Sequence, residues 1–231
     1  MFKHCITLLS LGTLLVGQPR EINFGGGPHQ REYSTGLKCI SEEERMFVRE
    51  HRIEIDHESM RDTVLFQDPM GNGGMMNLND SVLHQILNFV DQNSAVGWIL
   101  DYNCSFVTYD GHQGTDVAIG GFYYMDEMET PIVAAAPGIV TYSHDGEFDR
   151  RTSWINGAVA NGVIVSHSDG TSAWYWHMKK NTVAVAVGDT VVVGDTLGFV
   201  GSSGISGGPH LHFEVQNESG SVIDPWQGEC S

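Results

Sequence analysis

From about residue 98 onward, the chain is a series of short β-forming runs separated by glycine-containing turns. Two of these runs, residues 162–167 (GVIVSH) and 171–177 (TSAWYWH), flank the turn 168–170 (SDG). Such runs around an Asp-Gly turn are typical of a hairpin. Further runs follow at short spacing: 183–187, 190–193, 197–200 and 211–215. The sequence therefore predicts a mainly β domain over 98–231, a compact antiparallel sandwich or barrel.

The preceding part of the chain has a different texture. Residues 19–40 are rich in glycine and polar residues, and residues 41–62 are dense in charge, which predicts a flexible entry followed by a solvated helix or strap. In residues 78–90 apolar side chains recur at helical spacing, which predicts a short amphipathic helix. Residues 19–97 are therefore expected to form an N-terminal lead-in that is partly irregular or helical.

The first eighteen residues have the pattern of a secretory signal peptide. Lys3 supplies a positive charge, and residues 5–16 (CITLLSLGTLLV) form an apolar run that is too short to span a bilayer. No other stretch approaches the length of a membrane span, so stable membrane insertion is not expected. The sequence predicts a signal peptide at 1–18 and an exported protein, either periplasmic or extracellular.

The charge of the chain excludes two classes of partner. Lys and Arg number 12 against 29 Asp and Glu, for a formal net charge of −17. A chain this acidic has no electrostatic footprint for nucleic acid and is repelled by anionic lipid. The sequence does not indicate an oligomeric state.

Three cysteines follow the predicted signal peptide: Cys39, Cys104 and Cys230. An oxidising compartment permits one disulfide, and the spacing of the cysteines leaves the choice of pair open. No C-x-x-C motif is present, so a structural zinc-thiolate site is not expected.

A histidine-rich strand is predicted at 209–215 (PHLHFEV). Alternate residues of a strand face the same side, so His210, His212 and Glu214 share one face while the intervening apolar residues point into the core. Two imidazoles on one face can converge on a single ion or substrate.

A second cluster lies in residues 111–119 (GHQGTDVAI). Its glycines disfavour a helix, and a turn that enters a strand can fold His112 back beside Asp116. Two imidazoles and a carboxylate, with one vacant position, are the ligands of a catalytic zinc site. His177, at the end of the strand that carries Ala173 and Tyr175 on the same face, supplies a further imidazole.

These motifs, in this order, resemble the lysostaphin-type or LytM-type zinc endopeptidases, which cleave peptide bonds of bacterial peptidoglycan. The resemblance covers residues 109–226 and includes HxxxD, an isolated histidine, and HxH, together with 187–204 (VGDTVVVGDTLGFVGSSG). Trp176 departs from the family pattern, which often has a small residue there. Residues 142–160 look like an insertion at the rim of the groove.

The resemblance implies a metalloprotease, a hydrolase with one zinc ion per chain. His112, Asp116 and His212 would hold the zinc, which activates water for peptide hydrolysis, and His177 and His210 would assist catalysis. The division of base and oxyanion roles between these two histidines is left open. The implied partners are cell-wall peptides, either a cross-bridge or a stem peptide, or glycine-rich peptides that approach a wall formed by residues 204–208.

Other functions share parts of this pattern. A non-catalytic binding or activator module of the same fold would lack metal ligands, and a secreted protease of glycine-rich proteins would share all of them. A lipoyl or biotinyl carrier is disfavoured because residues 198–204 (GFVGSSG) contain no lysine. Whether the lead-in inhibits the groove is also left open.

Overall fold

A computed structural model describes residues 38–55, 63–70 and 84–231 of the chain. The predicted signal peptide at 1–18 and most of the glycine-rich entry at 19–40 lie outside the described residues. The elements of the described ranges are, in chain order, α1 (Glu42–His51), β1 (His84–Asn88), β2 (Thr115–Ile119), the π-helical turn η1 (Tyr124–Met128), β3 (Pro131–Val133), β4 (Gly138–His144), β5 (Gly162–Ser166), β6 (Ser172–Trp176), β7 (Thr190–Val191), β8 (Thr196–Phe199), β9 (His210–Gln216) and β10 (Val222–Ile223).

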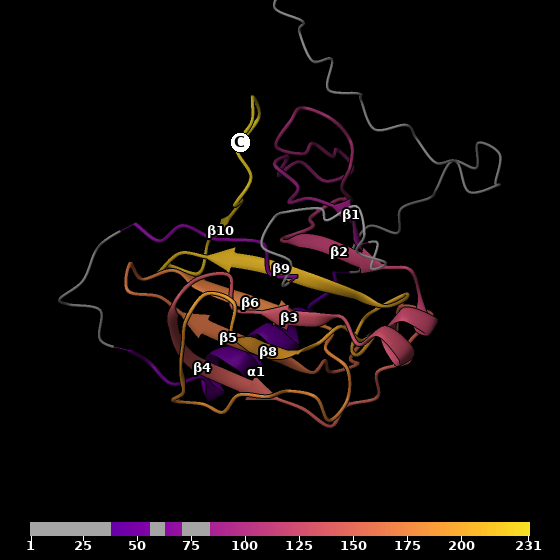
Figure 1. Cartoon of the computed structure of the whole chain (residues 1–231). Coiled ribbons are helices and arrows are strands. Elements are labelled where there is room, and N and C mark those ends of the chain that lie inside the picture. Colours follow the sequence, from indigo (N-terminus) through magenta and orange to yellow (C-terminus); the bar gives the residue numbers. More distant parts are fainter. Residues whose placement is uncertain (1–37, 56–62, 71–83) are drawn as a thin grey trace, which may run out of the picture. The chain divides into compact units, whose positions relative to one another are not determined.

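The strands form a large antiparallel sheet and a small one. The main sheet has the order β1-β2-β9-β6-β5-β4-β7, with β10 paired to β9, and β3 pairs with β8 in the second sheet. In Figure 1 the β3-β8 pair lies on one side of the main sheet and α1 on the other. The prediction of a mainly β, antiparallel fold is confirmed, and the hairpin predicted at 162–177 is the β5-β6 pair.

The central strands of the main sheet are buried on both faces, and the sequence of β5 shows why. Val163 and Val165 pack into the core beneath β3 and β8, whereas Ile164 packs into a second cluster on the face of α1. On β6, Trp174 and Trp176 also belong to this second cluster. A strand without polar alternation is typical of a sheet covered on both sides.

Helix α1 is docked on this second face rather than solvated. It begins at Ser41, whose hydroxyl accepts a hydrogen bond from the backbone N–H of Glu44 at 3.0 Å. Val48 is fully buried, and the guanidinium of Arg45 donates to both carboxylate oxygens of Glu214 at 2.7 and 2.8 Å. The prediction of a solvated helix or strap over 41–62 is therefore wrong for α1. The helix can dock on the sheet because its buried Arg45 is paired with the carboxylate of Glu214.

Glu44 forms the second polar anchor of α1. Its Oε1 accepts hydrogen bonds from the backbone N–H of Ala160 at 2.9 Å and from Nε1 of Trp176 at 3.1 Å. The bulky Trp176 thus has a partner in α1, which explains the large side chain at this position of β6.

One helix prediction and one strand prediction need correction. The amphipathic helix predicted at 78–90 lies partly outside the described residues, and its described part contains the strand β1, which pairs with β2. Pairing with the sheet edge satisfies the backbone hydrogen-bonding groups of β1. This gain outweighs the helix propensity of a short apolar pattern. Residues 183–187 form no strand, although the N–H of Ala184 donates to the carbonyl of Leu197 at 2.9 Å.

A disulfide joins Cys104 to Cys230, which settles the pairing that the sequence left open. It ties the C-terminal segment to the loop between β1 and β2. Cys39 is free and buried. None of the helices in the described ranges is long and apolar enough to cross a membrane.

We expect the Arg45–Glu214 ion pair to be essential for stability. Replacing Arg45 with Met leaves the Glu214 carboxylate buried without its counter-charge, which should cost about 3 to 5 kcal/mol of unfolding free energy. Urea denaturation measures this loss. Arg49→Met, at an exposed position of the same helix, is the matched control and should change stability by less than about 0.5 kcal/mol. Equal midpoints for the two variants would contradict the assignment.

Candidate metal centre and catalytic site

The register of the main sheet places two predicted ligands side by side. Asp116 of β2 and Trp176 of β6 are both paired with His212 of β9, so the three residues form one row across three strands. The neighbouring residues Leu211 and Phe213 point into the opposite core, as the alternation of β9 predicts. Asp116 and His212 therefore project from the face that α1 covers.

His112 reaches this row from the turn that precedes β2. Its backbone N–H donates to the carbonyl of Tyr109 at 3.0 Å, which closes the turn. A Cβ on Gly114 would lie 2.7 Å from Cε1 of His212, so only glycine allows the two segments to approach this closely. The chain from His112 to Asp116 thus folds back as the sequence predicts.

Three donor atoms converge at this point. His112 Nε2 lies 3.2 Å from His212 Nδ1 and 3.2 Å from Asp116 Oδ1, and His212 Nδ1 lies 2.9 Å from the same carboxylate oxygen. Zinc bound tetrahedrally at about 2.0 to 2.2 Å from nitrogen and oxygen ligands spaces them by about 3.3 to 3.6 Å. The triangle of donors is therefore slightly smaller than, and close to, the size that a single zinc ion requires.

The remaining polar atoms of the three side chains are held by partners that orient them. His112 Nδ1 lies 2.7 Å from the carbonyl oxygen of Phe89, and His212 Nε2 lies 3.3 Å from Glu214 Oε2. Asp116 Oδ2 accepts a hydrogen bond from Asn88 at 2.9 Å. With Nδ1–H and Nε2–H donated to these oxygens, two imidazole lone pairs and a carboxylate oxygen face one another, which calls for a cation between them.

Without a metal ion, protons supply this positive charge. Burial opposes protonation of His112, but the charge of Asp116 and hydrogen bonds with Asp116 and Cys39 together outweigh burial and raise the pKa of His112 to about 9. Burial likewise opposes ionisation of Glu214, and the charges of Arg45 and His212 together with their hydrogen bonds outweigh it and lower the pKa of Glu214 to about 2. Metal binding would displace protons from the site.

His177 joins the cluster through an unusual backbone conformation. It follows the last residue of β6, and its φ of 68° lies in the left-handed region. Its ring lies 4.5 Å from that of His210 and 5.9 Å from that of His212, on the α1 face. The sequence placed His177 on the face of Ala173 and Tyr175, which is wrong, because the turn in the backbone reverses the side chain.

His177 and His210 have the same hydrogen-bonding arrangement. Nδ1 of His177 lies 2.7 Å from the carbonyl oxygen of Ser203, and Nδ1 of His210 lies 2.8 Å from that of Gly208. Donation from Nδ1 leaves each Nε2 as a free acceptor. The Nε2 of His177 is buried and has no hydrogen-bond partner, and that of His210 lies 3.8 Å from Asp116 Oδ1.

Cys39 is the residue of this cluster that sequence reasoning missed. Its Sγ lies within 4.8 Å of the donor atoms of His112, Asp116 and His212, and 2.8 Å from the hydroxyl of Tyr109. Cys39 Sγ also lies within 4.8 Å of ring nitrogens of His177 and His210. The only sequence signal for Cys39 was the odd number of cysteines after the predicted signal peptide, which says nothing of its location.

The loop between β4 and β5 lies beside the cluster, as the sequence predicts for an insertion at the rim. The ring of Trp154 packs edge-on against Tyr109 at 5.6 Å, and its Nε1 lies 3.1 Å from the position of a Cβ on Gly207. Gly204 is buried, and a Cβ there would meet Ala160 at 2.6 Å. The predicted glycine-lined wall is therefore wrong at this position, where glycine is required for packing.

The chain resembles curated proteins over slightly less than half its length. It is 32% identical over 105 residues to the DD-carboxypeptidase/endopeptidase Mpg of Neisseria meningitidis serogroup B, covering 46% of this chain and 21% of that protein. It is 35% identical over 103 residues to the peptidoglycan DD-endopeptidase ShyC of Vibrio cholerae, covering 45% and 19%. With lysostaphin of Staphylococcus staphylolyticus it shares 32% identity over 100 residues, covering 41% and 18%. The matched segment spans about a fifth of each relative.

A solved structure and a family model each match about half of the chain. The catalytic domain of lysostaphin from Staphylococcus simulans is 28% identical, with a TM-score of 0.36, and the match covers 50% of this chain and 76% of that domain. The model of Peptidase family M23 matches residues 110–225, which is half of the chain and includes all five proposed site residues: His112, Asp116, His177, His210 and His212. The resemblance seen in the motifs is thereby confirmed, and the chain belongs to Peptidase family M23.

Proposed function

We propose that this protein is an exported zinc metalloendopeptidase that hydrolyses peptide bonds of peptidoglycan. The observation that carries the proposal is the triangle of His112 Nε2, Asp116 Oδ1 and His212 Nδ1, with sides of 2.9 to 3.2 Å. Each of these side chains is oriented by a second partner, as is usual for metal ligands. When bound there, zinc would act as a Lewis acid that polarises a peptide carbonyl and lowers the pKa of water.

His177 and His210 are proposed to handle protons beside the metal. Each ring has its Nδ1 held by a backbone carbonyl and its Nε2 free toward the cluster. Such a nitrogen can accept a proton from an attacking water and, once protonated, donate a hydrogen bond to the oxyanion or the proton to the leaving amine. The two rings lie 4.5 Å apart, so both can reach the same reacting centre.

The substrate class follows from the site chemistry and from the relatives. Hydrolysis of a sugar backbone normally requires two carboxyl groups that flank the bond. Here Asp116 is one of the proposed metal ligands and Glu214 is paired with Arg45, so neither is available as such a pair. Relatives named as peptidoglycan or glycyl-glycine endopeptidases support a peptide bond of the wall as the substrate.

Export is proposed from two features of the chain. The pattern of residues 1–18 is that of a signal peptide, and the Cys104–Cys230 disulfide is of the kind that persists in oxidising compartments.

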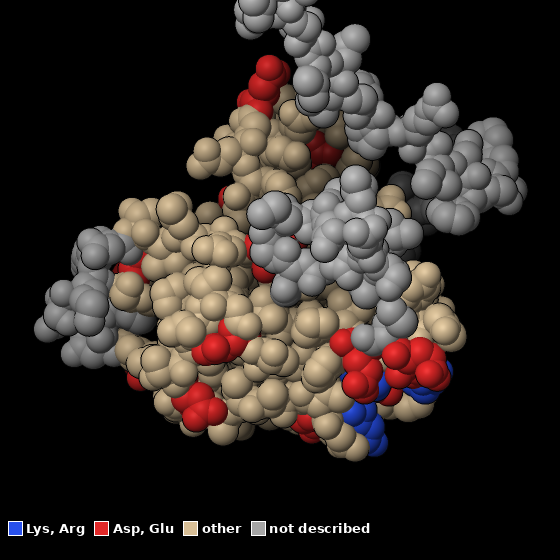
Figure 2. Space-filling view, in the orientation of Figure 1, with Lys and Arg blue, Asp and Glu red and all other residues tan. Residues whose placement is uncertain are grey.

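The acidic character of the chain fits a peptide substrate better than a polyanion. On the face shown in Figure 2, the few Lys and Arg atoms lie beside those of Asp and Glu.

The metal assignment predicts about one zinc per chain. His112→Ala, Asp116→Ala and His212→Ala should each remove most of the bound zinc, because three protein ligands are the minimum of a catalytic site. Metal analysis after dialysis measures the stoichiometry. His144→Ala is the matched control, since His144 pairs with Glu147 outside the cluster, and it should retain the metal. Full occupancy in all three ligand variants would refute the assignment.

The activity is tested by incubating the protein with purified peptidoglycan. New amino groups should appear without new reducing sugar ends, and a chelator should stop the release. His177→Ala and His210→Ala should retain zinc but lose about 10²- to 10⁴-fold in rate, because a positioned acid or base contributes that much.

The alternatives predict other products. New reducing ends would exclude a peptidase. No release of either kind from several wall chemistries, by the native protein and by Cys39→Ala alike, would favour a non-catalytic module. Cleavage of glycine-rich proteins alone would favour the secreted protease.

A further inference from the structure

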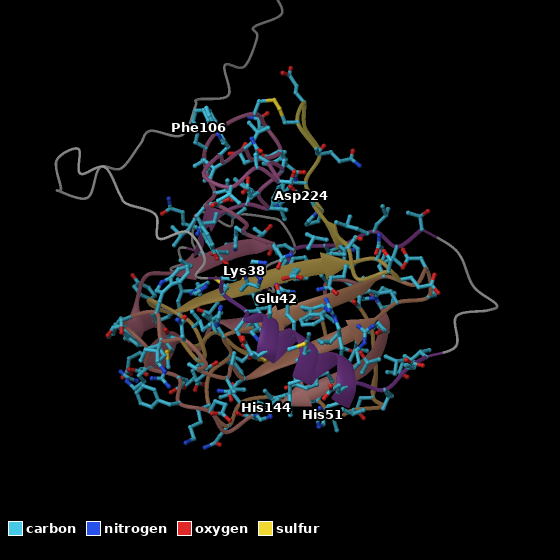
Figure 3. All side chains as sticks on the ribbon, turned by 180° about the vertical axis from the view of Figure 1, so that it is seen from behind. Lys38, Glu42, His51, Phe106, His144 and Asp224 are labelled. Atoms are coloured by element: carbon cyan, nitrogen blue, oxygen red, sulfur yellow. A yellow bond between two sulfur atoms is a disulfide. The ribbon has the colours of Figure 1, made fainter. Side chains whose placement is uncertain are left out.

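The segment that precedes α1 closes the proposed metal site. Lys38 and Glu42, labelled in Figure 3, bracket Cys39 on the side of the main sheet that α1 covers. His112, Asp116 and His212 are each at most 3% exposed, and Cys39 is itself 3% exposed. A peptidase site must admit a peptide, so this burial describes a closed form of the protein.

We propose that the Cys39 thiolate is the fourth protein ligand of the zinc and that the segment 38–51 thereby holds the peptidase in a latent form. The inference rests on the proposed zinc site. Catalytic zinc keeps one position for water or substrate, whereas four protein ligands make a closed site. The Sγ of Cys39 lies within 4.8 Å of all three other donors, and no other cysteine or carboxylate of the described residues joins that group.

An independent observation supports this position for the sulfur. The Nε2 of His177 is completely buried and has no hydrogen-bond partner, and it belongs to a second group with Cys39 and His210. In a working enzyme this nitrogen would face water or substrate. The thiol of Cys39 thus occupies the space toward which the two proposed catalytic imidazoles point.

Contacts on both sides of Cys39 fix it in place. The Tyr109 hydroxyl lies 2.8 Å from Sγ and can donate a hydrogen bond to the thiolate. On the other side, Ile40 is fully buried and Ser41 caps α1. The buried Arg45–Glu214 pair then holds the helix on the sheet. The docking of α1 on the sheet therefore brings the Cys39 thiol close to the proposed metal ligands.

The chemistry of closure and opening is a ligand exchange. Cys39 would bind zinc as a thiolate, so its thiol proton would be released to solvent and the sulfur would take the position that a catalytic site keeps for water. Departure of α1 from the sheet would withdraw the sulfur, return that position to water, and allow the thiolate to regain a proton. Access of substrate to the site therefore depends on the free energy with which α1 docks on the sheet.

Zinc-edge X-ray absorption of the full zinc-loaded chain tests the fourth ligand. We expect one sulfur at about 2.3 Å together with nitrogen and oxygen ligands at about 2.0 to 2.2 Å. Cys39→Ala should retain zinc and lose the sulfur shell. His144→Ala, which removes a side chain outside the cluster, is the control and should keep the sulfur shell.

The outcomes separate this inference from the proposed function. Bound zinc with only nitrogen and oxygen ligands would overturn the role of Cys39 and leave the zinc site intact. Absence of bound zinc would overturn both. Thiol titration adds a second readout, since zinc should slow the reaction of Cys39 with a thiol reagent. The rate of peptide hydrolysis should be higher in Cys39→Ala than in the native chain. If the native chain has the sulfur ligand and the two rates are equal, the proposal of a latent form is overturned.

Discussion

The buried carboxylate of Glu214 connects the two parts of this protein. One oxygen accepts a hydrogen bond from Arg45 of α1 at 2.7 Å, and the other lies 2.8 Å from the same guanidinium and 3.3 Å from His212 Nε2. Desolvating this charge would be costly without the guanidinium. The same carboxylate fixes which nitrogen of His212 carries the proton and so directs Nδ1 toward the other donors. The docking of α1 and the shape of the proposed metal site thus depend on one ion pair.

Local patterns in the sequence predicted the elements that carry the site. The alternation in 209–215 gave the face of His210 and His212, and the glycines around His112 correctly indicated a turn rather than a helix. These predictions succeed because strand alternation and glycine turns are set by neighbouring residues. The convergence of the histidines came from the family resemblance rather than from spacing alone.

The features that the sequence did not reveal depend on contacts between distant segments. Arg45 and Glu214 lie 169 residues apart, so charge density near α1 suggested a solvated helix. Cys39 carries no local motif, and its place in the cluster follows only from the docked helix. His177 is turned to the site by a left-handed backbone conformation that β6 does not predict. In each case tertiary packing decides where the side chain points.

The closed arrangement reconciles two demands on the chain. A site with several histidines and a carboxylate is expensive to bury, and a bound cation would compensate for that cost. Catalysis in turn requires that one side of the cation be open. Cys39, from the lead-in, would help to hold the cation in the buried site. Its withdrawal would then open the side of the cation that catalysis requires. The regulation of such a protein would then lie in the stability of one short helix on a sheet.

The most direct test of this view is the position of the metal in crystals of the zinc-loaded protein. Diffraction data collected on either side of the zinc absorption edge locate the ion without assumptions about its ligands. One anomalous peak is predicted at about 2.0 to 2.3 Å from His112 Nε2, Asp116 Oδ1, His212 Nδ1 and Cys39 Sγ. A peak elsewhere, or none, would contradict the proposed metal centre.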